Sequence, residues 1–335
     1  MKTLSGAMAL LLLTALLFVG TQCKRNNPVT TKDEPIPQDV LTAIATKGFS
    51  TVGVRKVANG YVVENDILLT ADALQRKDSV NEVILAKTEQ YYQIAITLSP
   101  VPIPRSILIS IDNTLPAAYS ASLDIAIARY NALNLRVIFQ KVAAGGADIS
   151  VTYGGNNQIG VGVEGQSGPP SNGNPYPIIY INSDFMGANP DANVLATIMA
   201  HEMGHCIGFR HTDWMNPTYS CFPGTPPVEA NATWIHATPT GPDAGSWMLA
   251  CNNLVDRPFT HNDIIALRYL YGYPPTLCGS NAQAIINGVC ETAGRSIDQE
   301  EYDPLHRRCM IRYYYLWSDG TQSQDYTALQ PGNCP

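Results

Sequence analysis

HEMGHCIGFRH, residues 201–211, is the stretch that decides the fold of this 335-residue chain. Residues four apart share one face of a helix, so His201 and His205 can direct both imidazoles at one point. Gly208 allows the helix to end and the chain to reverse, which brings His211 round as a third ligand. Three protein ligands leave one coordination position open, and an open position is typical of a catalytic zinc site.

Glu202 follows the first histidine and can reach a water on the metal without being a ligand itself. The alternatives are a set of satisfied buried histidines or a closed structural zinc site, which would need a fourth ligand. Cys206 has a suitable side chain, but it neighbours His205 and points off the ligand face. We therefore expect one catalytic Zn²⁺ ion, with Glu202 as the catalytic base.

The spacing H-E-x-x-H-x-x-G-x-x-H is the signature of the metzincin zinc proteases. These proteins have a methionine turn beneath the zinc, and Met248 in GSWMLA (residues 245–250) fits that structural role. From about residue 40 to about residue 275, the chain resembles the bacterial dual-action HEIGH metallopeptidases, with Met203 replacing the Ile. The resemblance implies an α+β fold, with a metzincin-like protease domain built from a twisted mixed sheet and an active-site helix.

The same resemblance implies a zinc-dependent endopeptidase that acts on protein or peptide substrates. Glu202 would take a proton from the zinc's water and pass it to the leaving amine. Substrate would lie along an edge strand, for which residues 159–164 and 177–182 are candidates, with plain sheet as an equal alternative. Astacin-like enzymes have a Tyr that can ligate zinc two residues after the turn methionine. This chain has Ala250 at that position and so lacks that ligand. The alternative function is an exported binding or adhesion protein with a vestigial protease domain.

Residues 61–69, YVVENDILL, resemble the astacin-type prosegment motif F-x-G-D-I, in which an Asp carboxylate ligates the zinc. Asp66 stands at the Asp position and is the candidate latency ligand. Asn65 replaces the Gly, and Asn adopts the left-handed conformation more readily than most residues. Residues 39–104 would then be a prosegment, cleaved near 100–104. The alternative is that Asp66 ends a hairpin strand at the surface.

The N-terminus has the pattern of an export signal. Lys2 precedes an apolar run over residues 8–19, which is too short to span a bilayer but suits a signal peptide over residues 1–22. Cys23 resembles a lipobox cysteine and is the candidate lipidation site, with plain cleavage and secretion as the alternative. We expect a cell-envelope lipoprotein or a secreted protein, with residues 23–38 as a tether and membrane contact only through the lipid.

Composition limits the partners. Hydrophobic residues make up 45% of the chain and charged residues 15%, which indicates a globular protein. The net charge is −7 and the sequence has no Lys/Arg cluster beyond short pairs, so we expect no nucleic-acid partner. We expect a monomer.

Seven cysteines follow Cys23, and in an oxidising compartment most of them would pair. Four of them lie within residues 278–334, which predicts a small disulfide-rich β module over residues 276–335. Cys221 and Cys251 flank the segment between His211 and the methionine turn, and we expect a bridge between them. Cys206 would then remain unpaired.

Local patterns predict the remaining elements. A hairpin is expected from strands 51–57 and 61–69 around Asn59-Gly60, and helices over 116–133 and from Asn189-Pro190 to 208. Further strands are expected at 107–111, 135–142, 148–153, 177–182 and 310–317, and the protease domain over 105–275. Residues 154–175 are predicted as a loop with a short extended piece near Val161.

Four further features have plainer interpretations. His236 and His261 lack partner spacing and are expected to be surface or structural residues, and His306 falls in the C-terminal module. Asp213 is expected to accept local hydrogen bonds. The aromatic run 313–317 could bind carbohydrate or peptide, but we favour a role in the core of the module.

Overall fold

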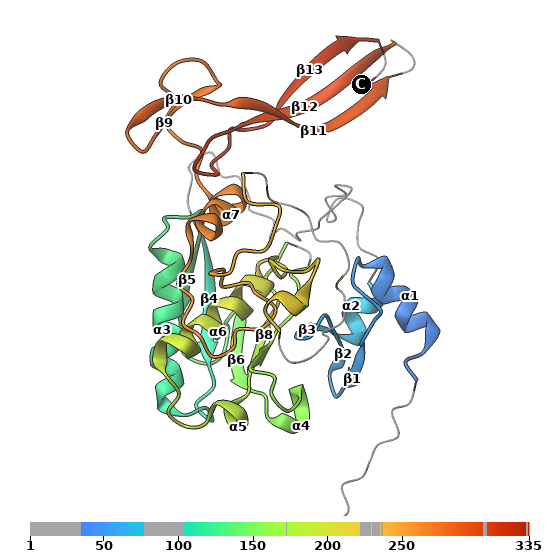
Figure 1. Ribbon diagram of the computed structural model, residues 1–335, viewed down its shortest axis with the longest axis vertical. Coiled ribbons are helices and arrows are strands. Elements are labelled where there is room, and N and C mark those ends of the chain that lie inside the picture. The colour runs from blue at the N-terminus through green and yellow to red at the C-terminus, as the bar shows by residue number, and fades with distance from the viewer. Residues whose placement is uncertain are drawn as a thin grey trace, which may run out of the picture. The chain divides into compact units, whose positions relative to one another are not determined.

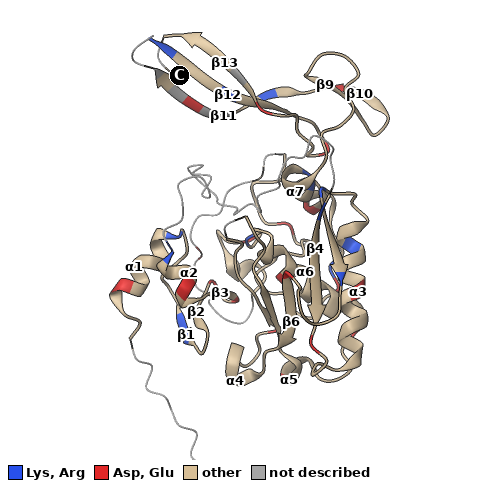
Figure 2. Cartoon of the chain, turned by 180° about the vertical axis from the view of Figure 1, so that it is seen from behind, with Lys and Arg blue, Asp and Glu red and all other residues tan. Residues whose placement is uncertain are grey.

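The computed structural model describes residues 35–76, 104–171, 173–221, 229, 235, 237–303, 307–332 and 334. Helices and strands alternate through the central part of the chain, and antiparallel sheets follow it (Figure 1). The predicted signal peptide, Cys23 and almost all of the expected cleavage region at residues 100–104 lie outside the described residues. Among the described helices, none combines the length and apolar character needed to cross a membrane. Charged positions are sparse and scattered over the helices and strands (Figure 2).

A five-stranded mixed sheet forms the centre of the predicted protease region. Its strands are β4 (Arg105–Ile111), β5 (Val137–Lys141), β6 (Ile149–Tyr153), β7 (Gly165–Gln166) and β8 (Ile178–Ile181). Their order is β5-β4-β6-β8-β7; the first four are parallel and β7 is antiparallel to β8. Four of these strands were predicted to within two residues at each end, and the mixed helix and sheet fold is confirmed.

Two helices cover one face of this sheet. α3 (Ala117–Asn131) and α6 (Ala192–Cys206) pack against each other, and each also contacts the sheet. The Tyr130 hydroxyl donates to the carbonyl oxygen of Ala200 at 2.8 Å, which ties the helices together inside the core. Each large side chain buried there contributes about 1.5–3 kcal/mol. Fully buried members of this core are Ile107, Ile109, Leu123, Val151, Ile179, Leu195 and Met199.

The start of α6 differs from the prediction. Its N-cap is Asp191, whose carboxylate accepts hydrogen bonds from the backbone N–H groups of Asn193 and Val194. Asn189 and Pro190 therefore lie before the helix. The prediction of an Asn cap was wrong because an Asp two residues later satisfies two of the helix's first N–H groups.

The N-terminal region is a small subdomain with its own apolar cluster of Ile44, Phe49, Val63, Ile67 and Leu69. It contains α1 (Gln38–Thr46), β1 (Arg55–Val57), β2 (Gly60–Val63), β3 (Ile67–Leu69) and α2 (Ala71–Gln75). The hairpin is confirmed, with Val57 opposite Gly60. The single strand predicted over 61–69 is wrong, because Glu64 and Asn65 adopt positive φ angles of 49° and 85° and turn the chain back.

The loop before β8 also differs from the prediction. Residues 160 and 162 are glycines with φ of 114° and 81°, so Val161 lies in a turn and the extended piece is β7, four residues later. A short helix, α4 (Asn156–Ile159), precedes this turn, and α5 (Ser183–Met186) follows β8. Strand β8 lies between β6 and β7, so residues 177–182 are not an edge. The edge strand on this side of the sheet is β7, and β5 forms the opposite edge.

The C-terminal module follows α7 (His261–Tyr271). It consists of β9 (Gln283–Ile286) with β10 (Val289–Thr292), and β11 (Gly294–Asp303), β12 (Arg308–Leu316) and β13 (Tyr326–Pro331), all antiparallel. The disulfides Cys278–Cys290 and Cys309–Cys334 confirm the predicted stapling.

The predicted aromatic strand is β12, and its side chains divide between two environments. Trp317, just after the strand, packs with Ala284 and Ile286 in a small core. The buried Tyr314 contacts Tyr269 of α7 through their hydroxyls at 2.8 Å. Tyr313 and Tyr315 form a partly exposed cluster with Tyr326. The core role that we favoured is confirmed for Trp317 and for Tyr315, which packs against the same small core, whereas Tyr314 is buried against α7.

Candidate metal centre

Helix α6 places His201 and His205 one turn apart on the same face, as their spacing predicts. Both are buried, and their ring centroids are 4.6 Å apart. The helix ends at Cys206, with Ile207 as its C-cap, because Gly208 adopts φ 111° and the N–H of Phe209 bonds back to Gly204 O at 2.9 Å. This reversal brings the ring of His211 to 5.2 Å from that of His201.

Each of the three imidazoles is held at Nδ1 by an oxygen. His201 is 2.8 Å from the carbonyl oxygen of Trp247, and His205 is 2.8 Å from that of Phe209. His211 is 2.6 Å from Oε1 of Glu229. Carbonyl and carboxylate oxygens only accept, so each Nδ1 carries the proton and each Nε2 presents a lone pair. All three Nε2 atoms are buried and lack a hydrogen-bond partner among the described residues.

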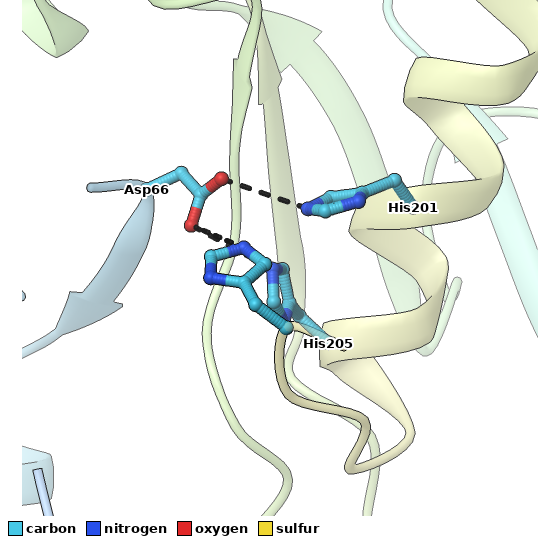
Figure 3. Close-up of side chains that lie close together, drawn as sticks. Asp66, His201 and His205 are labelled. Carbon is cyan, nitrogen blue, oxygen red and sulfur yellow. Dashed lines mark ion pairs between the residues drawn. The ribbon is translucent and has the colours of Figure 1, made fainter. Parts of the chain in front are cut away.

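Asp66 points into the space between these Nε2 atoms from the start of β3 (Figure 3). Its Oδ2 lies 3.6 Å from His201 Nε2, and its Oδ1 lies 3.6 Å from His205 Nε2 and 3.3 Å from His211 Nε2. The four ligand atoms all lie within 4.8 Å of one another. Asp66 is 8% exposed, so the alternative of a strand end at the surface was wrong.

Electrostatics favour a cation at this point. A lone pair on nitrogen repels a carboxylate oxygen unless a proton or a metal ion lies between them. Burial opposes the charged form of Asp66, but the neighbouring imidazoles of His211, His201 and His205 hold its pKa well below the usual range. Burial, together with His201, lowers the pKa of His205 and favours the neutral imidazole that metal ligation requires. The donor set of three imidazoles and a carboxylate fits zinc.

Glu202 is buried beside the histidines. It contacts Gly165 in edge strand β7 and Ser167 directly after that strand. The Ser167 hydroxyl donates to Oε2 of Glu202 at 2.7 Å. A Cβ on Gly165 would lie 2.7 Å from Oε1 of Glu202, so only glycine leaves room for the carboxylate. Burial raises the pKa of Glu202 well above its ordinary value, and the charge of Asp66 adds to this, although the hydrogen bond from Ser167 opposes it.

The predicted methionine turn lies directly beneath the helix. A Cβ on Gly204 would meet Met248 Sδ at 2.6 Å and Trp247 Nε1 at 3.3 Å, so the turn packs between the helix positions of His201 and His205. The N–H of Thr212 bonds to Met248 O at 2.8 Å, which joins the turn to the segment after His211.

The floor of the site is braced by the disulfide Cys221–Cys251, which was predicted. Asp213 accepts from the N–H of Ala250 at 2.9 Å and from the Ser220 hydroxyl at 2.6 Å, which confirms its role as a local acceptor. Among the described cysteines, Cys206 alone is free, and it is buried as predicted.

Backbone pairing fixes the segment that carries Asp66 against the edge of the main sheet. Leu68 N–H donates to Ser167 O at 2.6 Å, and Ser167 N–H donates to Asp66 O at 3.3 Å. Next to this pairing, Arg210 forms a buried ion pair with Glu64, and Glu64 also accepts from the N–H of Ser50 at 2.8 Å. The chain around Asp66 therefore occupies the position at which an extended peptide could add to the sheet.

Sequence reasoning missed Ser167, Gly165, Glu229 and the Glu64–Arg210 pair. Ser167 and Gly165 lie in a glycine-rich stretch without strand periodicity. Glu229 lies 18 residues after His211, and the sequence between them has no periodic pattern that would suggest the contact. Of the other histidines, His261 is exposed at the first position of α7, and His236 and His306 lie outside the described residues.

The arrangement of histidine pair, third histidine and methionine turn is the one that metzincin-type zinc metallopeptidases use. The sequence matches the dual-action HEIGH metallo-peptidase family over residues 61–271, more than half of the chain, and the chain belongs to this family. A comparison with curated proteins finds no match.

Among solved structures, the chain is similar to a crystal structure of myroilysin at 17% identity and a TM-score of 0.24, over 36% of this chain and 49% of that one. The chain thus spans about half the length of this first structure. A second myroilysin structure matches at 17% identity and a TM-score of 0.29, over 48% and 88%. High choriolytic enzyme 1, a hatching enzyme zinc-protease from Oryzias latipes (medaka fish), matches at 14% identity and a TM-score of 0.23, over 44% and 55%.

Proposed function

We propose that the protein is a zinc-dependent endopeptidase in which His201, His205 and His211 hold one ion and Glu202 is the general base. One observation carries the proposal: three buried Nε2 atoms converge, each left without a hydrogen-bond partner in the described structure while its Nδ1 is engaged. Histidines serving only as core residues would satisfy both nitrogens. Met248 supports the ligand helix from below without being a ligand.

Zinc at this position would lower the pKa of a water molecule and polarise the carbonyl of the peptide bond. Glu202 accepts the proton of the attacking water and then gives it to the leaving amine. Because burial raises its pKa, this carboxylate is a stronger base than an exposed glutamate, which suits the first of these two transfers. The Ser167 hydroxyl fixes one carboxylate oxygen and leaves the other to transfer the proton.

We propose further that the full chain is latent. The Asp66 carboxylate lies where the attacking water would have to bind, and the pairing of residues 66–68 with Ser167 fills the substrate's place along the sheet edge. Residues 39–104 are then the prosegment. Cleavage after α2 and before β4, near residues 100–104, would release it and open the protease domain of residues 105–275.

The central test is Glu202→Gln, which keeps the size of the side chain but removes the base. The full chain, activated by limited proteolysis between α2 and β4, should hydrolyse casein, and a chelator should abolish this. The variant should keep stoichiometric zinc and lose about 10²- to 10⁴-fold in rate.

Glu300→Gln, an exposed substitution in the C-terminal module, is the matched control and should behave like wild type. Hydrolysis by Glu202→Gln at nearly the wild-type rate would refute the assignment. Zinc binding without any hydrolysis by activated wild type would instead favour the binding or adhesion function.

We also propose that the protein is exported. Three disulfides among the described cysteines fit an oxidising compartment. Anchoring through lipid on Cys23 is tested by mass spectrometry of the mature N-terminal peptide. A peptide that begins with unmodified residues would show plain secretion instead.

A further inference from the structure

The three ligand histidines differ in what holds them. Backbone carbonyls hold His201 and His205, and these oxygens are fixed by the methionine turn and by the reversal after the helix. His211 lies beyond the end of α6, where no helical backbone orients it. Its Nδ1 is held by a side chain, Oε1 of Glu229, at 2.6 Å.

Glu229 is buried at considerable cost. The residue is 5% exposed, and its second oxygen, Oε2, has no hydrogen-bond partner within the described part of the chain. A carboxylate buried with incomplete partners costs several kcal/mol, so its presence needs a compensating interaction. The contact with His211 is the shortest hydrogen bond made by any of the three histidines, which makes it the strongest candidate.

We propose that Glu229 is a positioning residue of the metal centre, which fixes the orientation of the His211 ring and strengthens Nε2 as a ligand. A carboxylate that accepts the Nδ1 proton holds the imidazole in the tautomer that ligation requires. It also increases electron density at Nε2, which a backbone carbonyl does less effectively. This inference rests on the proposed function, because it assigns Glu229 to the same zinc site.

The competing explanation is a purely structural tether, in which Glu229 only holds its own segment against His211. The two explanations differ in their effect on zinc. A positioning residue changes zinc affinity, whereas a tether changes the stability of the protein whether or not zinc is bound.

The experiment is Glu229→Gln in the full chain, because Gln keeps the size and an acceptor oxygen but lacks the charge. Zinc dissociation constants are measured by competition with a chelator of known affinity, and thermal unfolding is followed with and without the metal. We expect zinc affinity to fall about 10- to 100-fold. The zinc-dependent rise in unfolding temperature should shrink accordingly, while metal-free protein unfolds close to wild type.

Glu164→Gln is the matched control. It replaces a partly buried glutamate whose pKa is raised by burial and lowered in part by the nearby His201, and among the described residues its side chain makes no hydrogen bond to a ligand histidine. We expect less than a threefold change in zinc affinity for this variant.

An unchanged zinc affinity in Glu229→Gln, or an equal loss in Glu164→Gln, would overturn the inference. A lower unfolding temperature of the metal-free Gln variant with wild-type zinc affinity would also overturn it and establish the tether. Failure of the wild-type chain to bind zinc at all would instead refute the proposed function.

Discussion

Replacing Asp66 with Ala tests whether the chain inhibits itself. Its carboxylate makes three contacts of 3.3–3.6 Å with the ligand histidines. We take about 1.5–3 kcal/mol for the total attraction of this carboxylate to the site through a bound ion, the size of one hydrogen bond to a charged group. Each 1.4 kcal/mol is a factor of ten in an equilibrium constant. Asp66→Ala should therefore raise the population of the open site, and with it kcat/KM of the full chain, about 10- to 100-fold.

Activity of the variant should remain below that of the processed protein, because two other anchors persist. These are the backbone pairing with Ser167 and the buried ion pair between Glu64 and Arg210. Adding Glu64→Gln to Asp66→Ala should raise activity further, since it leaves the metal ligands untouched while weakening the docked segment.

The assay is hydrolysis of a fluorogenic peptide by unprocessed protein at fixed zinc concentration. Asp72→Ala is the matched control, because Asp72 is exposed in α2 of the same region. Equal kcat/KM for wild type and Asp66→Ala would refute the latency proposal and leave residues 39–104 as a structural subdomain. An equal rise in Asp72→Ala would show general loosening of the region.

Three other predictions concern the support of the site. Ser167→Ala should lower kcat of processed protein about 10-fold or more with little change in KM, and Ser167→Thr should restore it if the hydroxyl to Glu202 matters. Gly204→Ala should reduce the free energy of unfolding by about 1–3 kcal/mol in denaturant titration, because its Cβ would meet Met248; wild-type stability would contradict this. Burial raises the pKa of Asp263 to about 6 from 3.8. The folded state therefore favours protonated Asp263. As pH rises through 4–6, the metal-free protein should lose up to about 3 kcal/mol of its free energy of unfolding. The Asp263→Asn variant should not show this loss.

The predictions that agree with the structure rest on residues that lie close together in the sequence. The 201–211 motif specifies a helix, its end and three ligands within a few residues, so short-range geometry was sufficient to bring them together. Asp66 was singled out by the resemblance of residues 61–69 to the astacin-type prosegment motif, in which Asn65 stands at the glycine position, and Asn65 has φ 85°. The disulfide between Cys221 and Cys251 followed from their positions around the methionine turn.

Contacts between segments that carry no periodic pattern escaped prediction. Edge strand β7 has only two residues within a glycine-rich loop, so neither its place nor the contact of Ser167 with Glu202 had a signal. The ion pair between Glu64 and Arg210 joins residues 146 positions apart, and either residue alone would pass for an exposed charge. Such pairings depend on how the N-terminal subdomain packs against the main sheet, which sequence spacing does not encode.

The bridge between Cys221 and Cys251 makes complete folding of the site depend on the redox state of the compartment that holds the protein. The bond closes a loop across a separation of 30 residues, which by chain entropy is worth about 3.5 kcal/mol. Because that bond forms only where thiols are oxidised, newly made chains in a reducing cytoplasm lack the brace under the methionine turn. With the export that we propose, the brace under the methionine turn would form only after the chain has left the cytoplasm.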